Sequence, residues 1–275
     1  MTVLTMPGQP AQPAPPGQAG PLRPLPWRRM AWVTWCQHRP ALIGVPAFFA
    51  ALAIVMLSEG LKIHHDYGPL LACHPLTAST CENLSNSVGS SDWHVGDAVN
   101  IALQLAPALI GAFAGVPLLA RELETGTYRY AWTQGIGRVR WAIGKIVLLA
   151  VVFAVGAAAV SQLNGWFFQP FAVQQDMSRL SAAVFDTWGI VLAGWVLAGF
   201  TLGAFLGMLI RRVIPAMIAT FATYCGIDLL TWQYLRPHYV VAGFWPAQLL
   251  EVGWLLALSA LLVAATVWLA RHRAA

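Results

Sequence analysis

Strongly polar side chains interrupt stretches of the sequence that are otherwise apolar. Asn100 and Gln104 are four residues apart, which places them on one face of a helix. Gln162 and the neighbouring Asn164 occur in a later stretch. Asp228 stands alone. Burying an ionisable group in hydrocarbon costs at least about 2.5–3.5 kcal/mol, so Asp228 is a candidate proton or cation site. The favoured alternatives are a hydrated or hydrogen-bonded aspartate, and amides that join helices by hydrogen bonds.

Histidines and one aspartate follow the first apolar stretch, and imidazole and carboxylate groups suit zinc or copper. The residues concerned are His64, His65, Asp66, His74 and His94. Their spacing is loose and does not fix four ligands in a tetrahedron. We therefore expect solvated loop residues here and no metal.

Two of the four cysteines, Cys73 and Cys81, lie close together in the same region. A bridge that closes so short a loop contributes about 2–3 kcal/mol if its geometry is unstrained and the compartment is oxidising. Cys73 and Cys81 are therefore a candidate disulfide. Cys36 and Cys225 are expected to be free thiols.

The composition excludes a soluble enzyme. Hydrophobic residues make up 58% of the 275 residues and charged residues 10%, whereas soluble domains have about 45–50% and about 25%. The net charge of +5 is not gathered on one soluble segment, which argues against a nucleic-acid partner. No phosphate-binding glycine motif of either common type occurs, so we expect this chain alone to bind no nucleotide.

Six apolar segments are long enough to cross about 30 Å of hydrocarbon, which takes about 20 helical residues. They cover residues 41–58, 100–120, 142–168, 184–210, 213–232 and 251–270. Residues 1–26 are rich in Pro, Gly and Gln and are expected to form a disordered cytoplasmic tail, because they cannot bury enough apolar surface to fold. The sequence thus predicts an all-α polytopic membrane protein with one domain over residues 27–275.

The basic residues predict the orientation of these segments. Thirteen of the sixteen Lys and Arg residues fall on the side that holds the N-terminus, and three, Lys62, Arg179 and Arg236, fall on the other. Cytoplasmic loops carry an excess of Lys and Arg. Both termini are therefore predicted to be cytoplasmic.

Glycines recur every four residues in the fourth segment, at Gly199, Gly203 and Gly207. Small residues on one helix face allow two backbones to approach closely in a membrane. We predict helix packing through this face, and the pattern leaves open whether the partner helix belongs to the same chain or to a second subunit. Pro107 and Pro117 should bend or interrupt the second segment.

The connection between the second and third segments has about twenty residues, although helix-to-helix connections usually need 2–8. Gly126 can end the helix that leaves the membrane, and Thr125 or Thr127 can cap a new one. Tyr128 and Trp132 then lie one turn apart on one face. We expect a short helix on the inner membrane surface, with a plain positively charged loop as the alternative.

The order acidic, any, acidic, any, Gly, Thr at residues 122–127 resembles the loop after the second span in permease subunits of type II ATP-binding-cassette (ABC) exporters. The segment AWVTWCQHRPALIGV, residues 31–45, looks like the interfacial helix that precedes the first span in that family. With six spans and both ends inside, the resemblance covers residues 27–275. One departure is the sequence QGIGR at residues 134–138, where many members have Pro, any residue, Ser or Thr, then Arg.

In that family the loop contains a coupling helix that docks on a separate ATPase subunit. The resemblance implies a pair of permease subunits in lipid, a homodimer or a heterodimer, that work with two ATPase subunits. The ATPase subunits would bind ATP and Mg, whereas this chain would bind no cofactor and have no catalytic residues. It also implies a set of ATPase-coupling residues, with glutamates and Arg129 as polar contacts and aromatic residues as apolar anchors. These are Glu122, Glu124, Gly126, Thr127, Tyr128, Arg129, Trp132 and Arg138.

The resemblance implies an exporter that forms the translocation pathway for a substrate, and the low charge of its spans favours a hydrophobic drug, lipid or peptide. Arg outnumbers Lys fourteen to two, which suggests a high-GC bacterial genome and hence a bacterial plasma membrane. Two alternatives remain open. One is a non-transporting anchor or sensor subunit that recruits a cytoplasmic partner, and the other is an ion-coupled secondary transporter with Asp228 as its site.

Overall fold

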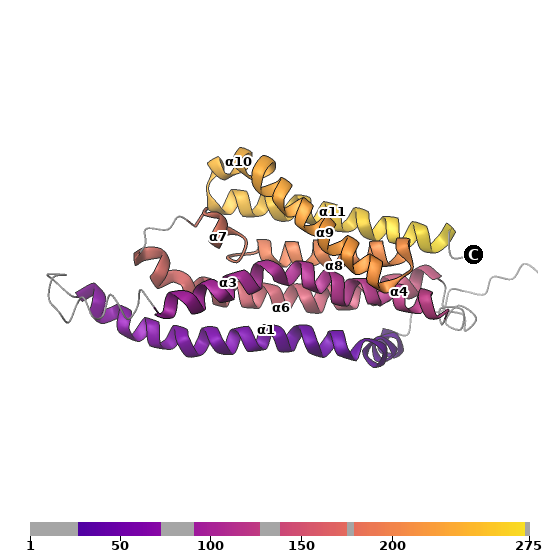
Figure 1. The fold of residues 1–275 in the computed structure, drawn as a ribbon, viewed down its shortest axis with the longest axis horizontal. Helices are drawn as coiled ribbons and strands as arrows, with labels where there is room; N and C mark the ends of the chain where they lie inside the picture. The colour runs from indigo at the N-terminus through magenta and orange to yellow at the C-terminus, as the bar shows by residue number, and fades with distance from the viewer. Residues whose placement is uncertain (1–26, 73–90, 127–137, 175–178, 273–275) are drawn as a thin grey trace, which may run out of the picture.

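The computed structural model describes residues 27–72, 91–126, 138–174 and 179–272 of the chain. Over these residues the regular elements are all helical, as predicted (Figure 1). The elements are α1 (Trp27–Ala72), α3 (Ser91–Ile110), the π-helix η1 (Gly111–Gly115), α4 (Val116–Thr125), α6 (Arg138–Gln174), α7 (Ala182–Phe185), α8 (Val191–Ile210), α9 (Val213–Leu230), the π-helix η2 (Thr231–Leu235), α10 (Arg236–Tyr239), the 3-10 helix η3 (Val240–Ala242) and α11 (Phe244–His272).

The described residues contain six helical segments that are long and apolar enough to cross a membrane. These are His38–His65, His94–Thr125, Ala142–Pro170, Val191–Ile210, Val213–Tyr239 and Phe244–His272. They run back and forth along one bundle, so the start of α1 and the end of α11 lie at the same end (Figure 1). We call this the inner end, because the basic residues predict that it faces the cytoplasm, and the opposite end the outer end.

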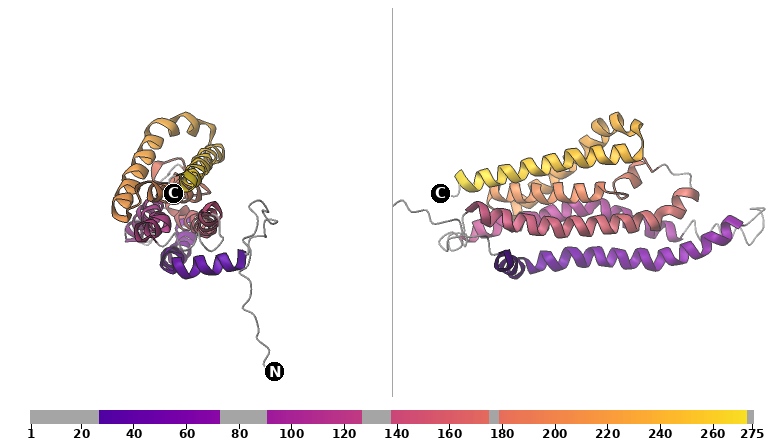
Figure 2. Two further views of the ribbon diagram at one scale, coloured as in Figure 1. Left: turned by 90° about the vertical axis from the view of Figure 1, so that its right-hand side faces the viewer. Right: turned by 180° about the vertical axis from the view of Figure 1, so that it is seen from behind.

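Helix α1 changes direction at His38, where φ is −115° and ψ is 23°. Its first turns run across the bundle and the rest runs along it (Figure 2), so the expected helix ahead of the first span is present as a separate arm. Along the span, a buried residue recurs every seven positions and faces α6; these residues are Leu42, Phe49, Met56 and Ile63.

This stripe continues beyond residue 58, where the first apolar segment was predicted to end, and the helix reaches Ala72. The expectation that His64, His65 and Asp66 lie in a loop is therefore wrong. His64 stacks on the Trp166 ring at 4.5 Å between ring centroids, and its Nε2 lies 2.9 Å from the Trp166 carbonyl oxygen. Contacts with α6, which the local sequence does not reveal, keep this stretch helical.

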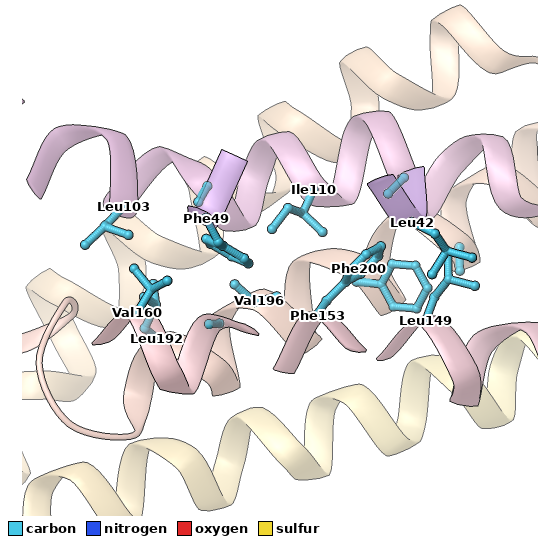
Figure 3. Close-up of a cluster of buried hydrophobic side chains, with 14 of the residues drawn as sticks. Leu42, Phe49, Leu103, Ile110, Leu149, Phe153, Val160, Leu192, Val196 and Phe200 are labelled. Atoms are coloured by element: carbon cyan, nitrogen blue, oxygen red, sulfur yellow. The ribbon is translucent and has the colours of Figure 1, made fainter. Parts of the chain in front are cut away.

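Helix α8 lies at the centre of the bundle. It packs against α3, α4, α6, α9 and α11, and 67% of its most apolar stretch is buried, compared with 17% for the first and the fifth spans. Its core face, with Leu192, Val196 and Phe200, meets residues of α1, α3 and α6 (Figure 3), and the Phe200 ring contacts the Phe153 ring edge-on at 5.3 Å. Viewed along the bundle, α1 lies on one side, and α9 and α11 lie on the other (Figure 2, left).

The glycines of α8 pack against the second span of the same chain, which answers the question that the sequence left open. Cβ atoms added at Gly199 and Gly203 would collide with the carbonyl oxygens of Pro107 and Gly111, and one added at Gly207 would lie 2.7 Å from the Val116 oxygen. The second span turns as the π-helix η1 at this contact, between Pro107 and Pro117. Proline cannot donate a backbone hydrogen bond, so regular α-helical bonding is weakened there.

The outer connections differ from the predicted boundaries. The fourth span begins at Val191, not at residue 184, because the chain first forms the short helix α7 and then turns at Gly189, whose φ is +78°. The fifth segment was predicted to end at residue 232 and the sixth to begin at residue 251. Instead, helical turns extend from both neighbouring spans and meet at Gly243, where φ is +97°.

The close approach of α8 to the second span can be tested with two glycine substitutions. Gly203→Ala forces the backbones apart and should destabilise the protein by about 1–3 kcal/mol. Gly226→Ala in α9 has open space for the new methyl group and should be neutral or stabilising by up to about 1 kcal/mol, because alanine favours helix. Thermal unfolding in detergent measures both, and equal stability of the two variants would contradict this packing.

Candidate functional site

At the inner end, both glutamates of the charged loop have partners within the chain. Glu122 in the last turns of α4 forms an ion pair with Lys145 of α6, whose side chain is only 4% exposed. Glu124 Oε2 accepts a hydrogen bond of 3.1 Å from the backbone N–H of Val213, the first residue of α9. A carboxylate is unfavourable at the C-terminus of its own helix and favourable at the N-terminus of another. The two glutamates therefore tie the end of α4 to the third and fifth spans.

Gly126 ends α4 in the left-handed conformation with φ +73°, as predicted. Thr125 is the last residue of α4, and its hydroxyl donates to the Arg121 carbonyl at 2.8 Å. The remaining coupling candidates Thr127, Tyr128, Arg129 and Trp132 lie outside the described residues, and Arg138 is the first residue of α6. The predicted helix within the loop therefore stays a prediction.

At the outer end, Arg236 of α10 joins three elements through its guanidinium group. It donates to both carboxylate oxygens of Asp186, which follows α7, and to both oxygens of Glu251 in α11, with Nη2 2.8 Å from Glu251 Oε1. Glu251 is fully buried and also accepts from Trp195 Nε1 at 2.9 Å and from the Tyr239 hydroxyl. A buried carboxylate is tolerated when its oxygens are satisfied in this way. We call Arg236, Asp186 and Glu251 the outer charge cluster.

The Asp186 carboxyl is the part of this cluster that lies outside the spans. Burial raises the pKa of Asp186 to about 6, although the Arg236 guanidinium beside it acts in the opposite direction. Asp186 therefore takes up a proton in mildly acidic solution, which leaves Arg236 paired with Glu251.

Two further polar groups hold the outer half of the bundle together. Asn100 Oδ1 accepts from Asn164 Nδ2 at 3.2 Å and from the Thr187 hydroxyl at 2.9 Å, so the hydrogen bond expected between the second and third spans is present. Gln248 of α11 accepts from the backbone N–H groups of Ile190 and Val191 at 2.9 and 3.0 Å. It thereby caps the N-terminus of α8, which has no cap from its own sequence.

Asp228 and Gln104 line a small cavity of about 40 Å³ at the outer end, between the second, fourth and fifth spans. Asp228 is partly buried in α9. The structure therefore brings two of the polar residues predicted from sequence together, along with Tyr224, one helical turn before Asp228, and with Asp186 and Trp195, which the sequence did not single out.

Some of the cysteines and histidines discussed from the sequence lie outside the residues that the structure describes. The candidate disulfide of Cys73 and Cys81, and His74, lie outside the described residues, so the bridge stays a prediction. Cys36 and Cys225 are free thiols, with Cys36 exposed and Cys225 partly buried.

A comparison with protein families matches residues 46–236 to a family described as ABC-2 membrane transporter related. The chain belongs to this family. Comparisons with curated proteins and with solved structures gave no match. Family membership makes the chain a multi-pass membrane subunit of a transporter, which is not itself catalytic and whose general partner is an ABC ATPase.

The buried charge pairs of this permease were not predicted from the sequence. Lys145 and Arg236 were counted only as charges that orient the spans, although each is buried against a carboxylate. Glu251 was taken as the boundary of the sixth span. The sequence feature that could have indicated these pairs is the position of each charged residue beside an apolar segment, because a charge buried there requires a partner.

Removing the cation of the outer charge cluster should be far more costly than breaking an exposed ion pair. Arg236→Met leaves Glu251 and Asp186 without their cation and should destabilise the permease by about 3–5 kcal/mol. Lys62→Met breaks the exposed Lys62–Glu59 pair and should cost less than about 1 kcal/mol. The measurement is unfolding of both purified variants in detergent, and a similar loss for both would contradict the structural role of Arg236.

Proposed function

We propose that this permease is the membrane subunit of an ATP-driven exporter and that its loop after α4 docks on a separate ATPase subunit. The observation that carries the proposal is the attachment of α4 to two other spans at the point where the loop begins. The Glu122–Lys145 pair joins α4 to α6, and the Glu124 hydrogen bond joins α4 to α9. A force on the loop would therefore reach three spans at once.

The route of such a force follows the contacts of α4. Its first residues pack against the glycine face of α8, where Val116 lies over Gly207. Closure of the ATPase subunits around ATP and Mg would push the loop, move α4, and carry α6, α8 and α9 with it. The pathway would then switch from inward-facing to outward-facing. Glu124 acts here by positioning α9 relative to α4, in addition to any contact with the ATPase.

A hydrophobic substrate such as a drug, lipid or peptide is supported by the walls of an apolar cavity beside α1. This cavity of about 360 Å³ lies between α1 and the second span, and drug-sized ligands occupy pockets of roughly 300–1,000 Å³. Its lining is entirely apolar: Pro40, Ala41, Gly44, Val45, Phe48, Ala106, Leu109, Ile110, Phe113 and Ala114.

We further propose that two permease subunits, identical or different, work together in a bacterial plasma membrane. The first and fifth spans have only 17% of their most apolar stretch buried within the chain. Their exposed faces are suited to contact lipid or a second permease subunit.

The link from Glu124 to α9 can be separated from a direct charge contact with the ATPase. Glu124→Ala removes the acceptor for the Val213 N–H group and should lower ATP hydrolysis by the co-expressed ATPase about fivefold or more, a typical coupling effect. Glu124→Gln keeps an acceptor oxygen and should retain most of the activity. Equal loss in both variants would assign Glu124 to a charge contact with the ATPase, and wild-type activity of Glu124→Ala would contradict the link.

Docking of the loop itself is tested by replacing residues 127–132 with a Gly/Ser linker. Because the replacement starts after Gly126, both glutamates keep their partners and the permease should fold and insert normally. We expect its ATPase partner to lose stimulation, measured as ATP turnover in membrane vesicles. Glu59→Gln, at the outer end, serves as the control and should leave turnover unchanged. Unchanged coupled hydrolysis with the linker in place would refute the proposal.

A further inference from the structure

The small outer cavity has an excess of negative charge around it. Asp186 and Asp228 line it, and Glu251 shares the partner Arg236 with Asp186. Arg236 is the cationic side chain paired within this group of three carboxylates among the described residues. The sum of the formal charges is therefore −2. Charges in a poorly solvated site are stable only when they are compensated. The described residues leave this compensation incomplete.

Asp228 is the carboxylate without a direct partner. The guanidinium nitrogens of Arg236 donate to Asp186 and Glu251, and the side chain of Asp228 has no hydrogen bond or ion pair to another described residue. Asp228 instead lines the cavity, as does Asp186. The unbalanced charge is thus directed at an open space.

Tyr224 gives a second and independent indication of a ligand. Its side chain is only 6% exposed, and its ring contacts the Trp195 ring edge-on at 5.5 Å. It lines the same cavity, and its hydroxyl has no hydrogen-bond partner within the described part of the chain. The hydroxyl of a tyrosine whose side chain is largely buried normally finds a hydrogen-bond partner. The Tyr224 hydroxyl therefore offers a neutral oxygen ligand beside the Asp228 carboxylate.

The volume of the cavity limits what can bind. About 40 Å³ is enough for a water molecule or a small cation, which needs roughly 10–15 Å³ or more by the same measure. The amide of Gln104 and the ring of Trp195 also line the cavity, and amide oxygens and aromatic rings both attract cations.

We propose that this cavity binds a single positive charge, carried by a primary ammonium group or by a small monovalent inorganic cation. Asp228 supplies the counter-charge, and the Tyr224 hydroxyl supplies an oxygen ligand. If the ammonium group belongs to a transported molecule, the substrate is a cationic amphiphile whose charged head reaches the outer end. That identification rests on the proposed exporter function, whereas binding of the cation does not.

The test uses the purified full-length permease in neutral detergent, without an ATPase. Octylammonium chloride is titrated at pH 7 and the thermal unfolding midpoint is followed, with octanol as the neutral control. A second series replaces choline chloride by sodium chloride at constant ionic strength. We expect one of the two small cations to raise the midpoint in a saturable way, and octanol to have no such effect.

Three variants decide the origin of the response. Asp228→Asn and Tyr224→Phe keep the shape of the cavity and should weaken the apparent affinity about tenfold or more, because each removes a group that contacts the charge. Asp97→Asn removes an exposed carboxylate of α3 outside the cavity and should leave the affinity unchanged.

A response to octylammonium alone identifies an amine site, and a response to sodium identifies an inorganic cation. Cation responses that are absent, or that are the same in Asp228→Asn as in the wild type, overturn the inference. Because no ATP turnover is measured, saturable binding combined with failed ATPase coupling would reject the exporter function and keep the cation site. Intact ATPase coupling without cation binding would reject the cation site and keep the exporter function.

Discussion

The close backbone contact between α8 and the second span is the constraint on which the rest of the structure depends. Gly199, Gly203 and Gly207 lie directly against the carbonyl groups of the second span. In a membrane no hydrophobic force drives two helices together, so close van der Waals packing between small residues has to hold them. Once this pair of helices is fixed, α1 and α6 pack on one side of it, and α9 and α11 on the other.

The polar contacts at the two ends of the bundle have a different role from this apolar packing. Each joins different spans. At the inner end Glu122 of the second span pairs with Lys145 of the third, and at the outer end Arg236 of the fifth span pairs with Glu251 of the sixth and with Asp186 of the connection before the fourth. A buried charge pair contributes little net stability, because desolvation offsets the attraction. Its main effect is to specify which residues face one another, since a helix that slides or rotates would leave a charge unpaired in hydrocarbon. The pairs therefore fix the register of helices whose apolar faces alone would tolerate several.

Features with a local physical cause could be predicted from the sequence. Length and apolarity gave the six spans, and the ability of Gly126 to adopt a positive φ gave the end of α4. The extension of α1 to Ala72, the late start of α8 at Val191 and the partners of the buried charges could not be predicted. Arg236 and Asp186 are separated by 50 residues, and a single sequence contains no signal for contacts at such a distance. For the glycines of α8, the sequence predicted a role in helix packing but did not predict which helix they contact.

The Gln248 side chain has a consequence for how the protein is made. It belongs to α11, which is synthesised after α8, yet it caps the start of α8 and also donates to the carbonyls of Phe185 and Trp188. Until α11 inserts, four backbone groups at the outer end of the bundle lack these hydrogen bonds. The hydrogen bonds at the start of the central helix are thus completed only after α11 has inserted. A chain truncated before residue 248 would contain all of α8 and yet leave the N-terminus of this helix without its cap.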